Sequence, residues 1–371
     1  MKVLPLFNAV NTPEMEVVAI EVLRSSQIAS GPYVASFEQG LEKLLNQKHI
    51  VTTVDMTSAI HLALYLAGVK AGDDVLTTVF ACMSTNSPIA TIGARPIWVD
   101  VAKDSAFIDV NDFEASITPK TKAAIVYHLA GYPAPIQEIA NICTKYNIIL
   151  IEDCNNAFLA SVNGRNVGSF GDYAVYSFYP NRQINTSEGG ALVCKNPDHA
   201  VRAKKLRRFG IDSPLFRAAS GEINPDCDIS EAGWSISLNN LCSGLGYTQL
   251  KTILNNIEKT RINASILIDA LISNSAITIL KSSDYSVSSY WALLIKVKNR
   301  DAILAALKKE GVMASILHQR NDIYSCFVES TRNLPNTLEL QNEIIAIPCG
   351  WWLNSSDLNK IAETVINAVK N

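Results

Sequence analysis

An alternation of strand and helix patterns constrains the fold of this chain more than any other feature. Short apolar runs, several of them rich in β-branched residues, recur through the first half of the chain, and stretches with helical spacing separate them. The runs lie at residues 49–54, 72–80, 95–100, 123–128 and 147–153. Strands that are buried on both faces have this composition, and strands that alternate with helices form βαβ units. The pattern predicts an α/β fold with a mostly parallel sheet that helices cover on both faces.

The length of the chain and a change of pattern predict two domains. A chain of 371 residues corresponds to about two domains. The pattern changes after about residue 200, and a helical stretch over residues 250–273 leads into a shorter set of strands and helices. We therefore predict a large α/β domain over residues 1–250 and a smaller α+β domain over residues 251–371.

Charge, hydropathy and cysteine usage exclude several classes of protein. The net charge is −3 and no basic stripe runs along the chain, which argues against nucleic-acid binding. No apolar run reaches the roughly 20 residues of a membrane-spanning helix, and Pro5 makes the N-terminal segment unlike a signal peptide. The eight cysteines are scattered without a CxxC pair, which argues against zinc and against a disulfide framework. We expect a cytoplasmic protein that binds no metal, nucleic acid or membrane.

One basic run, Arg202–Arg208, carries five charges in seven residues. Such a run is typical of a solvated helix face, and contact with a phosphate or another anion is the alternative. The sequence leaves both interpretations open.

The run at residues 147–153 is the cleanest buried strand pattern in the chain, and it ends in two acids, Glu152 and Asp153. Ligands of open α/β sheets bind at the carboxyl ends of the strands. Asp153 is therefore a candidate site residue.

A helix start follows the strand pattern at residues 49–54. Asp55 precedes Thr57, Ser58 and an apolar helical stretch. The first amides of a helix have no internal partner and lie at the positive end of its dipole, so they can bind a phosphate. An ordinary N-cap by Asp or Thr is the structural alternative.

The segment Ser177–Gly190 reads SFYPNRQINTSEGG, a strand end followed by a polar turn and a Glu-Gly-Gly corner. It resembles the cofactor-lysine segment of the DegT/DnrJ/EryC1/StrS family of sugar aminotransferases. In that family a lysine five residues after the serine forms a Schiff base with pyridoxal 5'-phosphate (PLP). Here that position is Arg182.

The resemblance extends from Leu4 to about Leu353 and implies the PLP-dependent transferase fold (type I). That fold has a large domain with a mostly parallel sheet of the seven-stranded type and a smaller C-terminal α+β domain. The resemblance also implies roles for individual residues. Asp153 would pair with the pyridine nitrogen, which keeps the ring protonated and a good electron sink. The other implied cofactor contacts are Thr57, Ser58 and Ser177 at the phosphate, Cys82 and Asn156 near the ring, and Ser235 from a neighbouring subunit.

The resemblance further implies the reaction and the partners. The family transfers an amino group, here expected from glutamate, to a keto-sugar that is nucleotide-linked or a sugar acid, in the biosynthesis of sugars or cell-surface polysaccharides. His318, Arg320 and Asn321 lie in a loop that approaches the substrate side in a subgroup of the family, and a surface salt-bridge loop is the alternative. Because the family builds its site from two subunits, we expect a homodimer.

Arg182 sets the chemistry apart from that of the family. A guanidinium stays protonated and is a poor nucleophile, so it cannot replace the lysine amine. PLP or pyridoxamine 5'-phosphate (PMP) would then bind through its phosphate and Asp153. Three explanations stay open: a Lys-to-Arg variant of an active aminotransferase, a relative with altered chemistry such as the sugar dehydratases that carry His at this position, and a non-catalytic homologue that binds a sugar or a partner.

Overall fold

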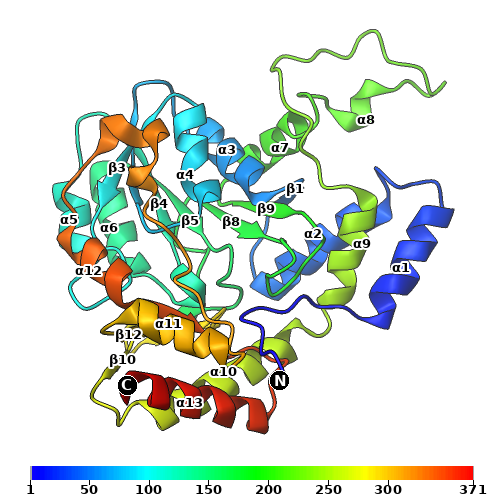
Figure 1. The fold of residues 1–371 in the computed structure, drawn as a ribbon. Coiled ribbons are helices and arrows are strands. Elements are labelled where there is room, and N and C mark those ends of the chain that lie inside the picture. Colours follow the sequence, from blue (N-terminus) through cyan, green and yellow to red (C-terminus); the bar gives the residue numbers. More distant parts are fainter. Residues whose placement is uncertain (1, 371) are drawn as a thin grey trace.

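A seven-stranded sheet forms the centre of the large domain in the computed structural model, which describes residues 2–370 (Figure 1). The strand order is β1-β9-β8-β5-β4-β2-β3. The strands are β1 Ile50–Thr53, β2 Asp74–Thr78, β3 Arg95–Val99, β4 Thr121–Tyr127, β5 Ile149–Asp153, β8 Tyr173–Ser177 and β9 Gly190–Cys194. β9 runs antiparallel to both of its neighbours, and all other adjacent strands are parallel. The predicted mostly parallel sheet is confirmed.

Helices cover both faces of this sheet, as the sequence predicts. The helices of this part of the chain, which include some that do not touch the sheet, are α1 Pro13–Arg24, α2 Pro32–Leu45, α3 Met56–Leu66, α4 Met83–Thr91, α5 Val110–Ala115, α6 Ile136–Tyr146, α7 Pro197–Leu206, α8 Ser213–Phe216 and α9 Asn240–Gln249. One core cluster joins α2 and α6 to the face that carries Leu76, and a second joins α3 and α7 to the face that carries Val75. None of the helices formed by residues 2–370 has the length and apolar character of a bilayer-spanning segment.

The first helix begins where its cap predicts and ends earlier than the apolar pattern suggests. Thr12 accepts a hydrogen bond from the amide of Met15, and proline follows at the first helical position. The pattern predicts a helix to about residue 30, but α1 ends at Arg24. The Ser25 hydroxyl donates to the carbonyl of Val22, and Ser26 takes a left-handed φ of 61° that a continuing helix cannot adopt.

The C-terminal part forms a smaller antiparallel sheet with helices on it (Figure 1). Its main elements are α10 Ile253–Leu271, β10 Ile277–Ile279, β12 Leu293–Val297, α11 Arg300–Lys309, β13 Ile344–Ile347 and α13 Ser355–Lys370. They share one apolar core, which Leu4 joins through a bridge to Val312. The predicted boundary at residue 250 lies between α9 and α10.

Two segments connect the parts. The first is a small sheet in which β11 pairs with the β6–β7 hairpin. The second runs from η2 to α12 and packs on the large domain, where Arg332 bonds Asp112 and the carbonyl of Trp98. The elements of these two segments are β6 Ser161–Val162, β7 Arg165–Asn166, β11 Ser286–Val287, η2 Asn321–Ile323, η3 Ser325–Ser330 and α12 Pro335–Glu343. A further short helix, η1 Leu129–Gly131, follows β4.

Residues 209–232 extend away from the body of the molecule and contain only the short helix α8 (Figure 1). Apolar side chains on this excursion are solvent-exposed in the single chain, including Phe209, Leu215 and Ile223. Exposed apolar side chains gathered on one projecting segment are typical of a surface that contacts another molecule.

Candidate active site

Asp153 lies at the carboxyl end of β5 and is fully buried. Its two oxygens are held by different donors. The Thr85 hydroxyl donates to Oδ2 at 2.7 Å, and Asn155 donates to Oδ1 from its backbone and side-chain amides at 3.1 and 2.9 Å. Burial raises the pKa of Asp153, while these hydrogen bonds and the charge of Arg182 act in the opposite direction. The carboxylate is thus fixed in orientation at the sheet edge where a ligand is expected.

Thr85 is a site residue that the sequence analysis missed. It is fully buried in α4, although its hydroxyl would ordinarily seek water. Thr85 and Asp153 are far apart in the sequence, and the fold brings the first turn of α4 beside the end of β5. A threonine on a helix has no distinguishing sequence signal, so residue patterns alone do not identify it.

A chain of hydrogen bonds joins Asn156, Tyr127 and His318. The Asn156 amide donates to the Tyr127 hydroxyl at 3.0 Å, and that hydroxyl lies 3.2 Å from Nε2 of His318. The hydroxyl and the imidazole share one hydrogen bond, and its direction follows the tautomer of His318. Burial, and then the nearby charge of Arg182, lower the pKa of His318 to about 4. Burial raises the pKa of Tyr127, which keeps its proton.

Arg182 points into the same region. Its backbone amide donates to the carbonyl of Tyr179, which closes the turn after β8. The guanidinium donates from Nη1 to Oδ1 of Asn181 at 2.6 Å. Burial lowers the pKa of Arg182, and the opposing influences come first from Tyr127 and Cys82 and then from Asp153. The residue at the family's lysine position therefore lies in one electrostatic cluster with the buried acid.

Trp291 supports Arg182 from the side of the small domain. The guanidinium carbon lies 4.7 Å from the centroid of the Trp291 ring, a cation–π contact. Trp291 stacks on Phe7 with the ring centroids 3.7 Å apart, and its Nε1 donates to the carbonyl of Asn181 at 2.6 Å. Three segments far apart in sequence thus meet here. Neither Trp291 nor Phe7 belongs to a pattern that the sequence analysis could use.

Gln183 links the Arg182 turn to the strand that carries Asp153. Its Nε2 donates to the carbonyl of Asn156 at 2.8 Å. Oε1 of Gln183 and Oδ1 of Asn156 are buried and have no hydrogen-bond partner within residues 2–370. Buried acceptors of this kind are normally satisfied by a donor, so they mark room for a polar ligand.

The expected phosphate seat lies at the start of α3. Thr57 and Ser58 are half-buried in its first turn, and Asp55 caps the helix by accepting from the Ser58 amide at 2.7 Å. The start of β9 lies against this turn, because a Cβ added to Gly190 would be 2.6 Å from the Asp55 carbonyl. Ser177 ends β8 and is buried. The helix start lies where the sequence predicts, and the Asp55 carboxylate already satisfies one of its amides.

Ser235 is exposed in the single chain, and the carbonyl of the next residue, Ile236, accepts from the amide of Val54 just after β1. It forms an antiparallel bridge with Arg208, at the base of the 209–232 excursion. The basic run nearby is largely paired, with Arg207 on Glu38 at 2.5 Å as its most buried ion pair. The side chains of Arg202, Lys204 and Lys205 are 42–51% exposed, as expected of a solvated helix face, whereas Arg207 packs against its own domain.

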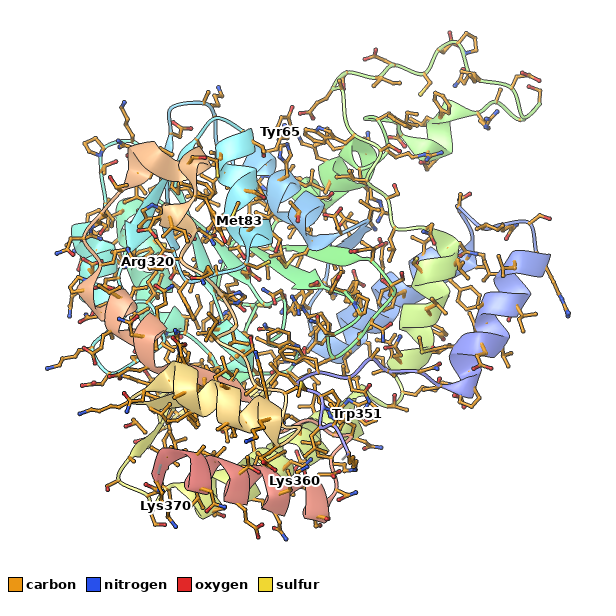
Figure 2. The ribbon with its side chains drawn as sticks, in the orientation of Figure 1. Tyr65, Met83, Arg320, Trp351, Lys360 and Lys370 are labelled. Carbon is orange, nitrogen blue, oxygen red and sulfur yellow. The ribbon has the colours of Figure 1, made fainter. Side chains whose placement is uncertain are left out.

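The three predicted substrate residues take different positions. His318 lies at Tyr127, in the cluster. Arg320 forms a two-bond ion pair with Asp322, at 2.6 and 3.0 Å, in a segment that packs on the large domain (Figure 2). Asn321 is buried, with its amide nitrogen on the carbonyl of Ala81. The contacts of Arg320 and Asn321 hold the loop on the large domain and thereby position the imidazole of His318.

Glu152, which precedes Asp153, has a structural role, because its carboxylate accepts hydrogen bonds from the backbone of a neighbouring loop. Its oxygens accept from the backbone amides of Gly168, Phe170 and Gly171 at 2.6–2.7 Å, and from His128 at 3.2 Å. His128, Glu152 and Cys154 have donor atoms within 4.8 Å of one another, as a metal site requires. The carboxylate, however, is already saturated by amide hydrogens, so this group connects β5 to the following loop.

The geometry agrees with the comparison with known proteins. The family model of the DegT/DnrJ/EryC1/StrS aminotransferases matches residues 11–366. The chain belongs to this family. A UDP-4-amino-4-deoxy-L-arabinose–oxoglutarate aminotransferase of Shewanella sediminis is 28% identical, with 98% of this chain and 97% of that protein covered.

Two solved structures of family proteins superpose closely on this member. The sugar aminotransferase CalS13 of Micromonospora echinospora has a TM-score of 0.92 at 28% identity and covers 98% of this chain and 99% of its own. AtS13 of Actinomadura melliaura has a TM-score of 0.93 at 29% identity and covers 99% of both chains. The fold predicted from the resemblance, that of the PLP-dependent transferases, is therefore confirmed.

Several groups of this DegT/DnrJ/EryC1/StrS protein are suited to the family cofactor, whereas Arg182 and the Asp55 carboxylate are not. Asp153 offers a buried carboxylate for a ring nitrogen, and Asn156 and Gln183 offer unpartnered buried acceptors. The start of α3 offers amides for a phosphate. Arg182 has no neutral amine, so it cannot form the Schiff base that a lysine forms with the cofactor.

Proposed function

We propose that this chain binds PLP or PMP without a covalent bond and has the substrate site of a sugar aminotransferase. The amino donor is glutamate, and the acceptor is a keto-sugar, nucleotide-linked or a sugar acid, of a polysaccharide or sugar biosynthetic route. Ordinary turnover is blocked because residue 182 is Arg. The observation that carries this proposal is the single cluster of Arg182, Asp153 and Tyr127 at the carboxyl edge of the sheet.

The relatives support the substrate class. The Shewanella protein is named for a UDP-linked amino sugar and for oxoglutarate, the keto acid that corresponds to glutamate. CalS13 is described as a sugar aminotransferase. Relatives at 28% identity that align over almost the whole chain support a shared reaction type and leave the particular sugar open.

The residues of this chain would divide the work as follows. Bound PLP supplies an electron sink for a carbanion at the substrate carbon. Asp153 keeps a proton on the ring nitrogen, and Thr85 holds the carboxylate in line for that contact. The neutral imidazole of His318, positioned by Tyr127, is a base of the cluster, and its lowered pKa makes it a weak one. Arg182 can orient an anion but cannot carry the proton.

A homodimer completes this proposal. Ser235 is exposed in the single chain, and the excursion of residues 209–232 projects its apolar side chains into solvent. A second copy that receives this segment would bury Phe209 and Leu215 and bring Ser235 to a cofactor phosphate. Sedimentation equilibrium of the full chain tests the dimer, and a monomer at micromolar concentration contradicts it. The cytoplasmic location stays a prediction.

Restoring the lysine tests the enzyme assignment. Arg182→Lys loaded with PLP should convert the cofactor to PMP when glutamate is added, whereas the parent chain should not. The absorbance spectrum of the cofactor reports both outcomes, and Arg182→Gln is the matched control without a nucleophile. An Arg182→Lys protein that binds PLP yet does not react with glutamate or any other amino acid contradicts the proposal.

A non-catalytic homologue is the second candidate, and one observation favours it. The Asp55 carboxylate takes the Ser58 amide and adds a negative charge where a phosphate is expected. If neither the parent chain nor Arg182→Lys binds PLP in equilibrium dialysis, this candidate replaces the first. A sugar dehydratase remains the third explanation for Arg182, and His318 gives it a base that the Ser177–Gly190 segment itself does not contain.

A further inference from the structure

The guanidinium of Arg182 has an unused hydrogen-bonding edge. Only Nη1 makes a hydrogen bond in the part of the chain that the structure describes, and its acceptor is Asn181. Nε is buried and has no partner there. A planar guanidinium presents Nε and one Nη as a parallel pair of donors, and this pair matches the two oxygens of a carboxylate.

The neighbours of Arg182 satisfy its face and leave this edge free. Trp291 lies 4.7 Å from the guanidinium carbon and covers one face of the group. A cation–π contact attracts the charge but accepts no N–H hydrogen bond in the plane. Trp291 cannot supply an in-plane acceptor, because an indole offers only the donor Nε1–H, which is bonded to the carbonyl of Asn181. The in-plane acceptor must come from elsewhere.

No acid of the protein fills that role. Among residues 2–370, Arg182 has no salt bridge within 4.0 Å, and the oxygens of Asp153 are taken by Thr85 and Asn155. Arg182 is partly buried and makes no direct ion pair among residues 2–370, and burial lowers its pKa, so an anion at the free edge would stabilise its charge. One monoanion would neutralise the charge, whereas a doubly charged phosphate would leave an excess negative charge next to Asp153.

We propose that the Nε–Nη2 edge of Arg182 is a carboxylate-binding site, which takes the carboxylate of a sugar acid or of an amino acid. The position that holds a reactive amine in the family has become an anchor for a planar anion. This inference depends on the contacts of Arg182 in the protein alone, and it holds whether or not the proposed amino transfer takes place.

The cofactor-free protein provides the test, with intrinsic tryptophan fluorescence as the readout. Trp291 contacts the guanidinium, so occupation of the edge should change its emission. The probes are D-glucuronate, L-glutamate and inorganic phosphate at constant ionic strength, with glucose as the uncharged comparison. We expect saturable binding of at least one carboxylate, and Arg182→Gln should weaken it tenfold or more. Arg182→Lys should weaken it similarly, because a point charge lacks the parallel donors.

Arg165→Gln is the matched control variant. Arg165 also lies over an aromatic ring, 4.3 Å from the centroid of Phe170, but its Nε already donates to the Ser169 hydroxyl. Removing this arginine should leave carboxylate affinity unchanged. Circular dichroism checks that each variant is folded, and isothermal calorimetry of the wild type supplies a measurement that needs no variant.

Each outcome decides the proposal. Tighter binding of glucuronate assigns a sugar acid, and tighter binding of glutamate assigns an amino acid. Absence of saturable carboxylate binding to the wild type, by both fluorescence and calorimetry, overturns the proposal. Equal affinity in Arg182→Gln also overturns it, as does phosphate binding at Arg182 that matches or exceeds that of the carboxylates.

Discussion

Acidification should destabilise this protein through His318. Nε2 of the imidazole lies 3.2 Å from the Tyr127 hydroxyl, which in turn accepts from the Asn156 amide. Protonation would place a second positive charge near Arg182 in a partly buried network. Burial, followed by repulsion from Arg182, lowers the pKa of His318 to about 4, against an ordinary value of 6.5.

The sign and size follow from proton linkage. Between pH 6.5 and about 4 the unfolded chain binds a proton at residue 318 that the folded chain does not. Stability therefore rises with pH in this window and is lost as the pH falls through it. At about 1.4 kcal/mol per pH unit, the full loss reaches about 3 kcal/mol, and most of it is present by about pH 4.5.

The assay is urea unfolding at about pH 7 and about pH 4.5 for the wild type and for His318→Gln. The glutamine keeps an acceptor for Tyr127 but does not titrate. Asp153 acts with the opposite sign, since its raised folded pKa adds stability as the pH falls, and the comparison removes this contribution because both proteins contain it. The wild type should lose about 2–3 kcal/mol more than the variant. Equal losses in the two proteins would refute the reasoning.

Three further perturbations test other parts of the site. Glu152→Gln places an amide N–H₂ against backbone donors that now face a carboxylate, and it should lower the free energy of unfolding by about 3 kcal/mol in urea; a loss below about 1 kcal/mol contradicts this structural role. Gly190→Ala puts a methyl 2.6 Å from the Asp55 carbonyl, so the start of α3 must shift, and the PLP affinity measured by dialysis should fall about tenfold. An unchanged affinity contradicts phosphate binding at the start of α3. Asp153→Asn should weaken PLP binding by about tenfold or more, while Thr85→Val, which removes one supporting bond, should cost less; the reverse order would exclude the ring-nitrogen contact.

Sequence patterns predicted the sheet well because they depend on local chemistry. The five strand runs of the first half coincide with β1 to β5, since strands covered on both faces need continuous apolar residues. The predicted end of α1 at about residue 30 was too late, because a serine hydroxyl and one left-handed residue ended the helix at Arg24 within an otherwise helical pattern. The helical stretch predicted at residues 250–273 corresponds to α10, Ile253–Leu271.

The site was predictable only where its residues lie in a family motif. Asp153 and Arg182 follow recognisable strand ends, and the structure places both in one electrostatic cluster. Thr85 and Trp291 come from unremarkable positions and reach the cluster through tertiary packing. The hydrogen bond of His318 to Tyr127 spans 191 residues, a separation at which no local pattern operates.

Covalent attachment of PLP tests the central claim most directly. The parent chain and Arg182→Lys are incubated with PLP and reduced with borohydride. Mass spectrometry of the intact proteins and of their peptides then measures covalent attachment, while dialysis of unreduced samples measures total binding. The account predicts that both proteins bind PLP but that only Arg182→Lys retains the mass of the cofactor, on the peptide that contains residue 182. A covalent adduct at the same peptide of the parent chain, or a lysine variant that binds PLP without an adduct there, would contradict it.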